Sequence, residues 1–289
     1  MRRIKELFKD NNDIKDVIKK GNCVIATIDN KRYVIKNKCN NEICNLYEYL
    51  SSRNFEYFPK IINNNDKYNV YEYIEDIENP IEQKAYDMMY MLSLLHNKTT
   101  YYKEMDIDEY KEIFENISYI IDSRINYYNN LINIIESNIF ISPSHYLIAR
   151  NISKIFGALE YSKRNISEWY DLVKTKGKKR VVTLYNNVDL NHIIRNKDVY
   201  LISWDKSRVG SPIDDLYNFY TNYSNILDLK DLLKYYEDRY PLLEEEKMLF
   251  NILISIPNEL EFTDNEIDNC KITKKIIDSL YRSEVIISE

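Results

Sequence analysis

The residues with chemical potential concentrate in one short stretch of the chain. It combines an amide, two carboxylates, an imidazole and a hydroxyl, at Asn187, Asp189, His192, Ser203 and Asp205. Carboxylates can act as general bases or as ligands of Mg²⁺. An amide accepts no proton at a useful pKa, an imidazole nitrogen is poorly matched to hard Mg²⁺, and a serine hydroxyl brings no charge. The stretch therefore mixes groups that could support metal-assisted chemistry with neutral groups that could not.

Counts and spacings exclude several other kinds of site. The four cysteines form no C-x-x-C pair, and the three histidines are too scattered for a zinc site, so no metal is expected. Only four glycines are present, which leaves almost no material for phosphate-cradling glycine-rich loops. The wealth of Asn, Ile, Lys and Tyr is typical of an AT-rich bacterial genome.

Charge and hydropathy restrict the partners and the compartment. The net charge of −6 argues against nucleic acid as a partner, because phosphate backbones require clustered Lys and Arg. The one basic stretch, residues 174–180, is interpreted as a solvated loop, and the acidic run 244–246 as a solvated helix face. No apolar run is long enough to span a membrane and no signal peptide is recognisable, so we expect a cytoplasmic protein without membrane contact.

The first part of the chain predicts a hairpin preceded by helix. The polar sequence of residues 2–20 predicts one or two short helices that end near Gly21. The β-branched stretch 23–28 and the stretch 31–36 flank the turn dipeptide Asp29-Asn30, which is typical of a β-hairpin.

A helix and two further strands are expected to complete this small lobe. Asn40 or Asn41 can cap a helix that runs to about Ser52. The stretches 58–62 and 67–74 are interpreted as strands joined by a polar turn. Residues 1–76 therefore predict an N-lobe of about four strands and one helix.

The rest of the chain is mostly helical. Apolar residues recur at three- and four-residue spacing, and the β-rich stretches are short. Helices are expected at 81–96, 107–137, 143–173 and in four pieces after Pro212, and strands at 181–185 and 199–204. We predict an α+β, two-lobed architecture with a C-lobe at 77–289.

Segment 184–216 resembles the catalytic segment of the aminoglycoside phosphotransferase and spore-coat kinase-like family. In that family the segment reads His-Gly-Asp-Leu-x-x-x-Asn-Ile-Leu, then Ile-Asp-Trp-Glu, then Gly-Asp-Pro-x-x-Asp-Leu. Here it reads Tyr185-Asn186-Asn187-Val188-Asp189-Leu190-Asn191-His192-Ile193-Ile194, then Leu201-Ile202-Ser203-Trp204-Asp205, then Gly210-Ser211-Pro212-Ile213-Asp214-Asp215-Leu216. The resemblance implies a protein-kinase-like fold with a small β-rich N-lobe and a large helical C-lobe.

Weaker counterparts extend the resemblance over nearly the whole chain. Val34-Ile35-Lys36 looks like the strand that carries the phosphate-binding lysine. Glu42 is nearest to the position of the ion-pair partner of this lysine, with Glu48 as a second option. The resemblance implies structural roles for Trp204, Gly210, Pro212 and Asp215.

The departures from the family pattern fall on its chemical positions. In this register Asn187 stands at the general base, while His192 and Ser203 stand at the two metal ligands. Two carboxylates could rescue the chemistry. Asp189 requires a register shift that loses the Ile-Ile match, and the side chain of Asp205 would point away from the Trp204 face if this stretch is a strand.

The resemblance therefore implies a pseudokinase: a binding, regulatory or structural protein without ordinary phosphoryl transfer. Neither ATP nor Mg²⁺ is expected as a cofactor, and the partner would be an unknown protein or a small molecule in the interlobe cleft. The alternative is an atypical ATP- and Mg²⁺-dependent phosphotransferase that acts on a hydroxyl group through Lys36, Asp189 and Asp205. A third hypothesis, a component of an assembly such as a spore coat, depends on family analogy alone.

Overall fold

The computed structural model describes residues 14–21, 23–38 and 42–288. Two compact units emerge from the contacts of the backbone. The first unit comprises the described residues up to Thr99 together with Tyr185–Arg208, and the second comprises Thr100–Leu184 and Val209 onward. In this division the helix after Pro80 and the segment 185–208 group with the N-terminal sheet, and the lobe boundary expected at residue 76 stays a prediction.

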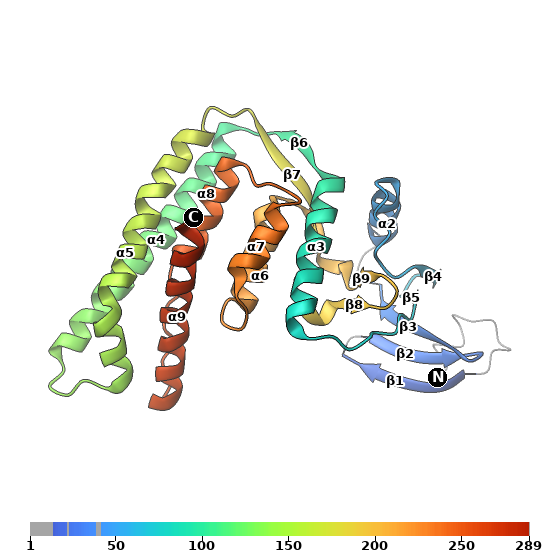
Figure 1. Ribbon diagram of the computed structural model, residues 1–289, viewed down its shortest axis with the longest axis horizontal. Coiled ribbons are helices and arrows are strands. Elements are labelled where there is room, and N and C mark those ends of the chain that lie inside the picture. The colour runs from blue at the N-terminus through green and yellow to red at the C-terminus, as the bar shows by residue number, and fades with distance from the viewer. Residues whose placement is uncertain (1–13, 22, 39–41, 289) are drawn as a thin grey trace. The chain divides into compact units, whose positions relative to one another are not determined.

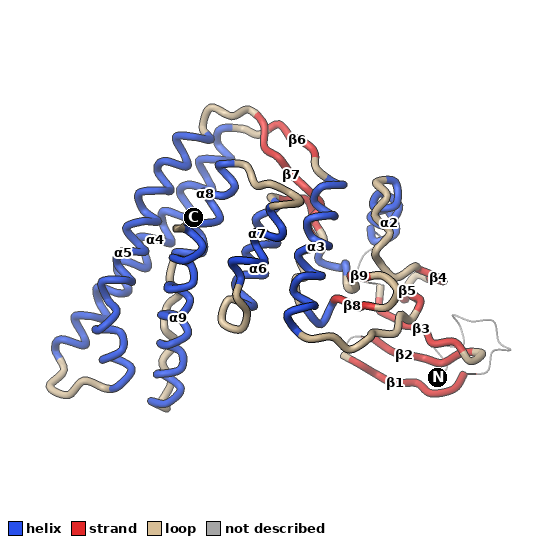
Figure 2. The backbone as a smooth tube through the Cα atoms, in the orientation of Figure 1, coloured by secondary structure: helices blue, strands red, loops and turns tan. Residues whose placement is uncertain are grey.

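The first unit contains a five-stranded antiparallel sheet in the order β1-β2-β3-β5-β4. Its strands are β1 (Ile14–Lys20), β2 (Cys23–Ile28), β3 (Lys31–Asn37), β4 (Ile61–Asn64) and β5 (Tyr68–Glu72). Inward-facing residues of β2, β3 and β5 form its apolar core, namely Ala26, Ile28, Ile35 and Val70. Figure 2 shows these strands, in red, gathered together.

The predicted hairpin is confirmed, whereas the helix predicted at 2–20 is wrong over its described part. Asp29 and Asn30 both have positive φ, 49° and 62°, as the tight turn of a two-residue hairpin requires. Residues 14–20 form β1, which pairs with β2 across the turn at Gly21 (φ 55°). The remainder of that predicted helix and the proposed caps Asn40 and Asn41 lie outside the described residues.

The remaining elements of the first unit connect to this sheet. They are α2 (Glu42–Ser52), α3 (Ile81–Thr99), the 3₁₀ turns η1 (Leu190–His192) and η2 (Trp204–Lys206), and the hairpin β8 (Ile193–Arg195) and β9 (Val199–Leu201). Two backbone hydrogen bonds tie the β8–β9 hairpin to the N-terminal part, from Ile77 to Arg195 (2.8 Å) and from Leu201 to Tyr57 (2.9 Å). The Arg195 guanidinium also donates to both carboxylate oxygens of Asp87 on α3, at 3.1 and 3.0 Å.

The second unit is mainly helical. Its helices are α4 (Ile107–Ser137), α5 (Pro143–Val173), α6 (Pro212–Tyr223), α7 (Leu229–Glu237), α8 (Glu244–Ser255) and α9 (Glu266–Ile287). The predicted ranges of α4 and α5 and the four helical pieces after Pro212 are confirmed. In Figure 1, α4 and α5 run antiparallel and α9 lies along α5.

A three-stranded sheet in the order β10-β7-β6 accompanies these helices. Its strands are β6 (Tyr101–Glu104), β7 (Lys178–Leu184) and β10 (Arg208–Gly210), of which only β7 is predicted. The basic stretch predicted as a solvated loop enters β7, and the acidic run predicted as a solvated face is partly buried. Arg180 forms a buried ion pair with Glu246, and Lys176 pairs with Glu245 at 2.8 Å.

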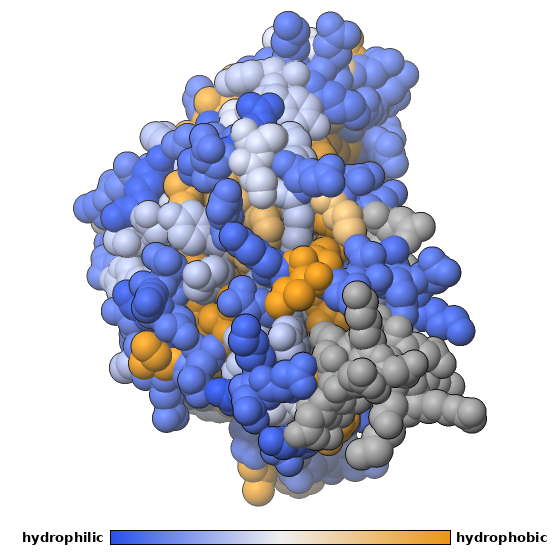
Figure 3. Space-filling view, turned by 90° about the vertical axis from the view of Figure 1, so that its right-hand side faces the viewer, coloured by the Kyte–Doolittle hydropathy of each residue, from blue (hydrophilic) through white to orange (hydrophobic). Residues whose placement is uncertain are grey.

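The surface seen in Figure 3 is largely polar, as the content of 30% charged residues leads one to expect. On the side of the N-terminal sheet it is mostly hydrophilic, with small separate hydrophobic areas (Figure 3). Among the described residues, none of the helices combines the length and apolar character needed to cross a membrane.

Candidate functional site

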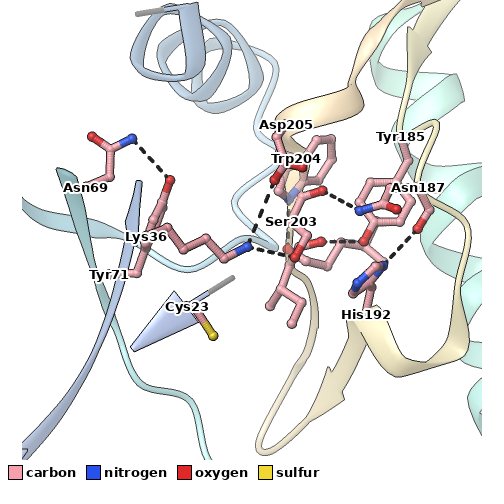
Figure 4. Close-up of polar contacts among 12 residues, drawn as sticks. Cys23, Lys36, Asn69, Tyr71, Tyr185, Asn187, His192, Ser203, Trp204 and Asp205 are labelled. Atoms are coloured by element: carbon pink, nitrogen blue, oxygen red, sulfur yellow. Dashed lines mark hydrogen bonds and ion pairs between the residues drawn. The ribbon is translucent and has the colours of Figure 1, made fainter. Parts of the chain in front are cut away.

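Lys36 is the centre of a polar group within the first unit. It lies on β3, where its neighbours across the sheet are Cys23 on β2 and Asn69 on β5. Its ammonium donates a hydrogen bond of 2.7 Å to the hydroxyl of Ser203. The same ammonium lies 4.0 Å from Asp205 Oδ1, as Figure 4 shows. The fold thus brings together residues from the predicted lysine strand and from the predicted catalytic segment.

The backbone at Ser203 determines where these side chains lie. Ser203 has left-handed dihedral angles, φ 65° and ψ 58°, which cost a non-glycine residue about 1–3 kcal/mol. The chain then enters the 3₁₀ turn η2, so the strand expected at 199–204 ends at Leu201. The expectation that Asp205 points away from the Trp204 face held only for a strand, and this stretch is not a strand. On η2 the Asp205 carboxylate reaches the neighbourhood of Lys36.

Asn187 and His192 lie beside Ser203. The Asn187 side-chain amide donates to the backbone carbonyl of Ser203 at 2.8 Å. The Nδ1 atom of His192 lies 3.3 Å from the carbonyl of Asn187, and the His192 carbonyl accepts a hydrogen bond from Ile202. The three positions singled out from the sequence are thus linked to one another through neutral side chains and backbone groups (Figure 4).

Buried aromatic side chains pack beside the backbone that carries Ser203. Tyr185 is fully buried, its hydroxyl donates to the Ile202 carbonyl, and its ring packs edge-on against Trp204 at 5.1 Å. The Trp204 indole donates to the Leu201 carbonyl at 2.8 Å. Phe55 and Phe58 also contact the indole edge-on. These rings hold the backbone of 201–204, from which Ser203 and Asp205 project.

Asn186 gives conformational support to the register of the resemblance. It stands where the His-Gly-Asp pattern has its glycine, and its φ is 54°. Asparagine adopts this left-handed conformation more readily than most residues, so it is a suitable replacement in a glycine-poor chain. The Asn186 side chain also donates to the Lys206 carbonyl at 3.0 Å, which connects the start of this loop to η2.

Asp189, the other carboxylate that could rescue the chemistry, accepts hydrogen bonds from a nearby residue. Asp189 caps the turn η1, where Oδ1 accepts from the backbone and the side-chain nitrogens of Asn191 at 2.8 and 2.9 Å. Its proposed role as a base stays a prediction.

The remaining predicted residues lie elsewhere. Glu42 and Glu48 are exposed on α2, and their pairing with Lys36 stays a prediction. In the second unit, Gly210 ends β10, Pro212 begins α6, and Asp215 is fully buried in the first turn of α6. The structural roles inferred for these three residues also stay predictions.

Tyr47 is a neighbour of the site that no sequence motif indicates. It lies on the buried face of α2 and stacks on Phe58 with ring centroids 4.1 Å apart. Burial raises the pKa of the Tyr47 hydroxyl well above its usual value, and negative charge at Tyr71 and Asp205 adds to this effect. Its helical spacing marks it as buried but cannot indicate that a carboxylate lies nearby.

The donor set at this group does not fit a Mg²⁺–nucleotide complex. Mg²⁺ prefers carboxylates and other hard oxygen ligands that offset the phosphate charge. At the three family positions the structure has an amide, an imidazole and a hydroxyl, and the Asp205 carboxylate beside Lys36 is 40% exposed. In the part of the chain that the structure describes, no group of three or more His, Cys, Asp or Glu residues is arranged to hold a metal ion.

Comparisons with known proteins support the fold and nothing finer. No protein-family model matches the chain, and neither does any curated protein sequence. An aminoglycoside phosphotransferase structure from Alicyclobacillus acidocaldarius is 11% identical with a TM-score of 0.68, over 95% of this chain and 91% of that chain. The AMP-bound spectinomycin phosphotransferase is 14% identical with a TM-score of 0.57, over 99% and 97%. Choline kinase LicA from Streptococcus pneumoniae is 17% identical with a TM-score of 0.52, over 96% and 98%.

The chain therefore has the α+β protein-kinase-like fold of the aminoglycoside phosphotransferases and choline kinase, and the predicted fold class is confirmed. Identities this low establish the fold alone.

Proposed function

We propose that this chain is a kinase-like protein that does not transfer phosphoryl groups and acts by binding, in a regulatory or structural role. The observation that carries the proposal is the hydrogen-bonded group around Ser203, in which an amide, an imidazole and a hydroxyl stand at the three family positions. The Ser203 hydroxyl accepts from Lys36 and its carbonyl accepts from Asn187. Phosphoryl transfer in this fold depends on positioning and on electrostatic stabilisation by metal-bound carboxylates, together with a carboxylate base.

The chemistry of each group supports this proposal. Asn187 cannot accept a proton from an attacking hydroxyl, because its amide has no basic site at neutral pH. Ser203 offers no negative charge to a metal ion, and its hydroxyl already accepts one hydrogen bond from the Lys36 ammonium. A phosphate group that approached Lys36 would have to compete with Ser203 and with the charge on Asp205.

A second candidate function is favoured by one observation, the Asp205 carboxylate 4.0 Å from Lys36. Asp205 could serve as a metal ligand in an atypical ATP-dependent phosphotransferase, with Asp189 as the base. Structures with the same fold include a spectinomycin phosphotransferase and a choline kinase. Under this candidate the acceptor would be a hydroxyl group of a small molecule.

Measurement of ATP turnover separates the two candidates. The purified chain with Mg²⁺ and ATP is expected to show no phosphate release above that of the Lys36→Met variant, because base and metal ligands are both missing. Asp205→Asn is the informative substitution, and Asp198→Asn, which removes an exposed carboxylate in the β8–β9 turn, is its matched control. Turnover that Asp205→Asn abolishes and Asp198→Asn preserves would establish the phosphotransferase and reject the proposal.

Restoration of the family residues tests the same idea from the opposite direction. The triple variant Asn187→Asp, His192→Asn and Ser203→Asp returns a base and two metal ligands to their positions. If it binds nucleotide while the parent chain does not, the site is a kinase site that has lost its chemistry. If the parent chain binds Mg²⁺–ATP as tightly as the triple variant, these three positions do not control binding and the proposal fails.

A further inference from the structure

The turn between α4 and α5 carries three consecutive apolar side chains on its outside. Ile139 is 92% exposed, Phe140 is 90% exposed and Ile141 is 51% exposed. Tyr146 on the first turns of α5 and Phe262 on the loop before α9 are exposed at the same end of the second unit. His145 packs against the Phe262 ring at 5.5 Å, and Figure 1 shows this turn beside the start of α9. We call these five exposed side chains the apolar tip.

This composition is unusual for a turn between two helices. Turns that project into solvent are normally built from Asn, Asp, Gly, Pro and Ser. The same chain follows that rule elsewhere, since the connection between β4 and β5 reads Asn65-Asp66-Lys67. Single exposed apolar residues need no explanation, but a contiguous exposed group marks an interaction site.

The tip is held in a defined conformation. Asn138 closes α4 with a hydrogen bond from its backbone N–H to Ile135 at 3.3 Å. Ser142 caps α5, and the N–H of Ser144 donates to the Glu266 carboxylate on α9 at 2.6 Å. The three apolar residues are therefore projected from a fixed base formed by three helices, and little order has to be gained when they bind.

Charge around the tip indicates what kind of surface it fits. Exposed carboxylates flank the members of the tip in the sequence: Glu136 precedes the turn, and Glu261 and Asp264 stand on either side of Phe262. The nearest cations in the sequence are Arg150 and Lys271, and Lys271 pairs with Asp268 at 2.9 Å. We call these three carboxylates the acidic border. Their charge repels an anionic lipid surface and a second copy of the same border. It is complementary to the apolar face of a helix that is bordered by Lys and Arg.

We propose that the apolar tip is a docking site for another protein, which covers Phe140 and its neighbours with the apolar face of a helix bordered by basic residues. Binding buries the exposed Ile and Phe side chains and pairs the acidic border with the cations of that helix. The proposal depends on the second unit alone and does not require the proposed function of the Lys36 group.

A labelled amphipathic helical peptide of leucine and lysine serves as the probe, with a leucine–glutamate peptide as its counterpart. Fluorescence anisotropy with the full chain is expected to show binding of the Leu–Lys peptide that weakens as salt rises. The double substitution Ile139→Asp and Phe140→Asp is expected to weaken this binding about tenfold or more, although it adds negative charge that attracts the peptide. Tyr119→Asp, at a residue 76% exposed in the middle of α4, is the control and should leave binding unchanged.

Charge reversal tests the acidic border separately. Glu136→Lys with Asp264→Lys should weaken the binding of the Leu–Lys peptide and flatten its salt dependence, whereas Glu112→Lys on the first turns of α4 should not. Equal binding by the tip variant and the parent chain overturns the proposal, and so does equal binding of the Leu–Glu peptide. Tip-dependent binding to phosphatidylcholine or phosphatidylserine vesicles, or tip-dependent self-association in sedimentation at neutral pH, assigns the tip to lipid or to a second copy and also overturns it.

Discussion

The polar side chains around Lys36 contact one another directly. Lys36 donates to Ser203, Asn187 donates to the Ser203 carbonyl, and Asp205 lies beside the ammonium. Each neutral hydrogen bond of this kind contributes about 1 kcal/mol to stability, and bonds from a charged donor contribute somewhat more. The left-handed backbone at Ser203 is thus maintained by contacts on both its side chain and its carbonyl.

Two ion pairs of the second unit differ in burial while their acidic residues are adjacent in sequence. Arg180 and Glu246 have side chains that are only 10% and 7% exposed, and Glu246 also accepts from the Leu243 N–H at 3.0 Å. Lys176 and Glu245 are 37% and 19% exposed. Removal of one partner from a buried pair leaves an uncompensated charge, whereas an exposed pair is largely screened by water.

Glu246→Ala is therefore expected to lower the free energy of unfolding by about 3 kcal/mol or more. The neighbouring substitution Glu245→Ala should cost less than about 1 kcal/mol. Urea unfolding of both variants, followed by circular dichroism, checks the difference. Similar losses for the two variants would mean that burial of the Arg180–Glu246 pair contributes nothing special.

The sequence predicts which residues of segment 184–216 lie together better than it predicts which charged residues form ion pairs. The register of Asn187, His192 and Ser203 follows from local spacing, and the structure brings these residues together. The basic stretch 174–180 and the acidic run 244–246 look solvated because each is local and charged. The ion pairs between them join residues that are far apart in the sequence, so the spacing within either stretch cannot indicate them.

At the level of elements, the spacing of apolar residues predicts the long helices well, and the residue types at the Asp29-Asn30 turn predict the first hairpin. The edge strand β1 is missed because its sequence is polar, with Val17 and Ile18 exposed at 41% and 60%. Its strand conformation comes from pairing with β2 rather than from an apolar face of its own. The short strand β6 is missed for the same reason, since it is exposed throughout and is held by β7.

Glu266 links the ends of two helices in a way that makes stability depend on pH. Hydrogen bonds from the backbone and side chain of Ser144 lower the pKa of Glu266 to about 2. Its carboxylate also lies at the N-terminus of α5, where negative charge is favourable. The ionised form is thus favoured in the folded chain.

The sign of the resulting pH dependence follows from that lowered pKa. Glu266 stabilises the fold fully above the unfolded-state pKa of about 4.3, and this contribution is lost as pH falls toward 2. The stability difference between the parent chain and Glu266→Gln should therefore be constant from pH 7 to about 5 and shrink below that range. Urea unfolding at several pH values measures it, with Glu261→Gln on the preceding exposed loop as the control. A difference that does not change with pH would contradict the assignment.

For the whole molecule, the resemblance predicts the fold class, whereas local sequence pattern does not indicate which distant segments share a compact unit. The segment 185–208 is far from the N-terminal sheet in sequence, yet it belongs to the same compact unit. Contacts such as Arg195 with Asp87, and Leu201 with Tyr57, join them. The boundary expected at residue 76 is based on the change from a strand-like to a helix-like sequence pattern. That change gives no information about contacts between distant segments.

Any ligand that binds only the folded chain must stabilise the whole molecule, so nucleotide binding can be measured without knowing a substrate. A ligand present at 100 times its Kd adds about 2.7 kcal/mol, which corresponds to a rise in Tm of roughly 5–10 °C for a chain of this size. Because its donor set lacks carboxylates at the metal positions, the parent chain is expected to show no Mg²⁺-dependent rise with ATP. The variant with Asn187→Asp, His192→Asn and Ser203→Asp is expected to show one that EDTA removes. Differential scanning fluorimetry with ATP, with and without Mg²⁺, makes the comparison, and a Mg²⁺-dependent rise in the parent chain that Asp205→Asn removes would mean that Asp205 replaces the missing ligands.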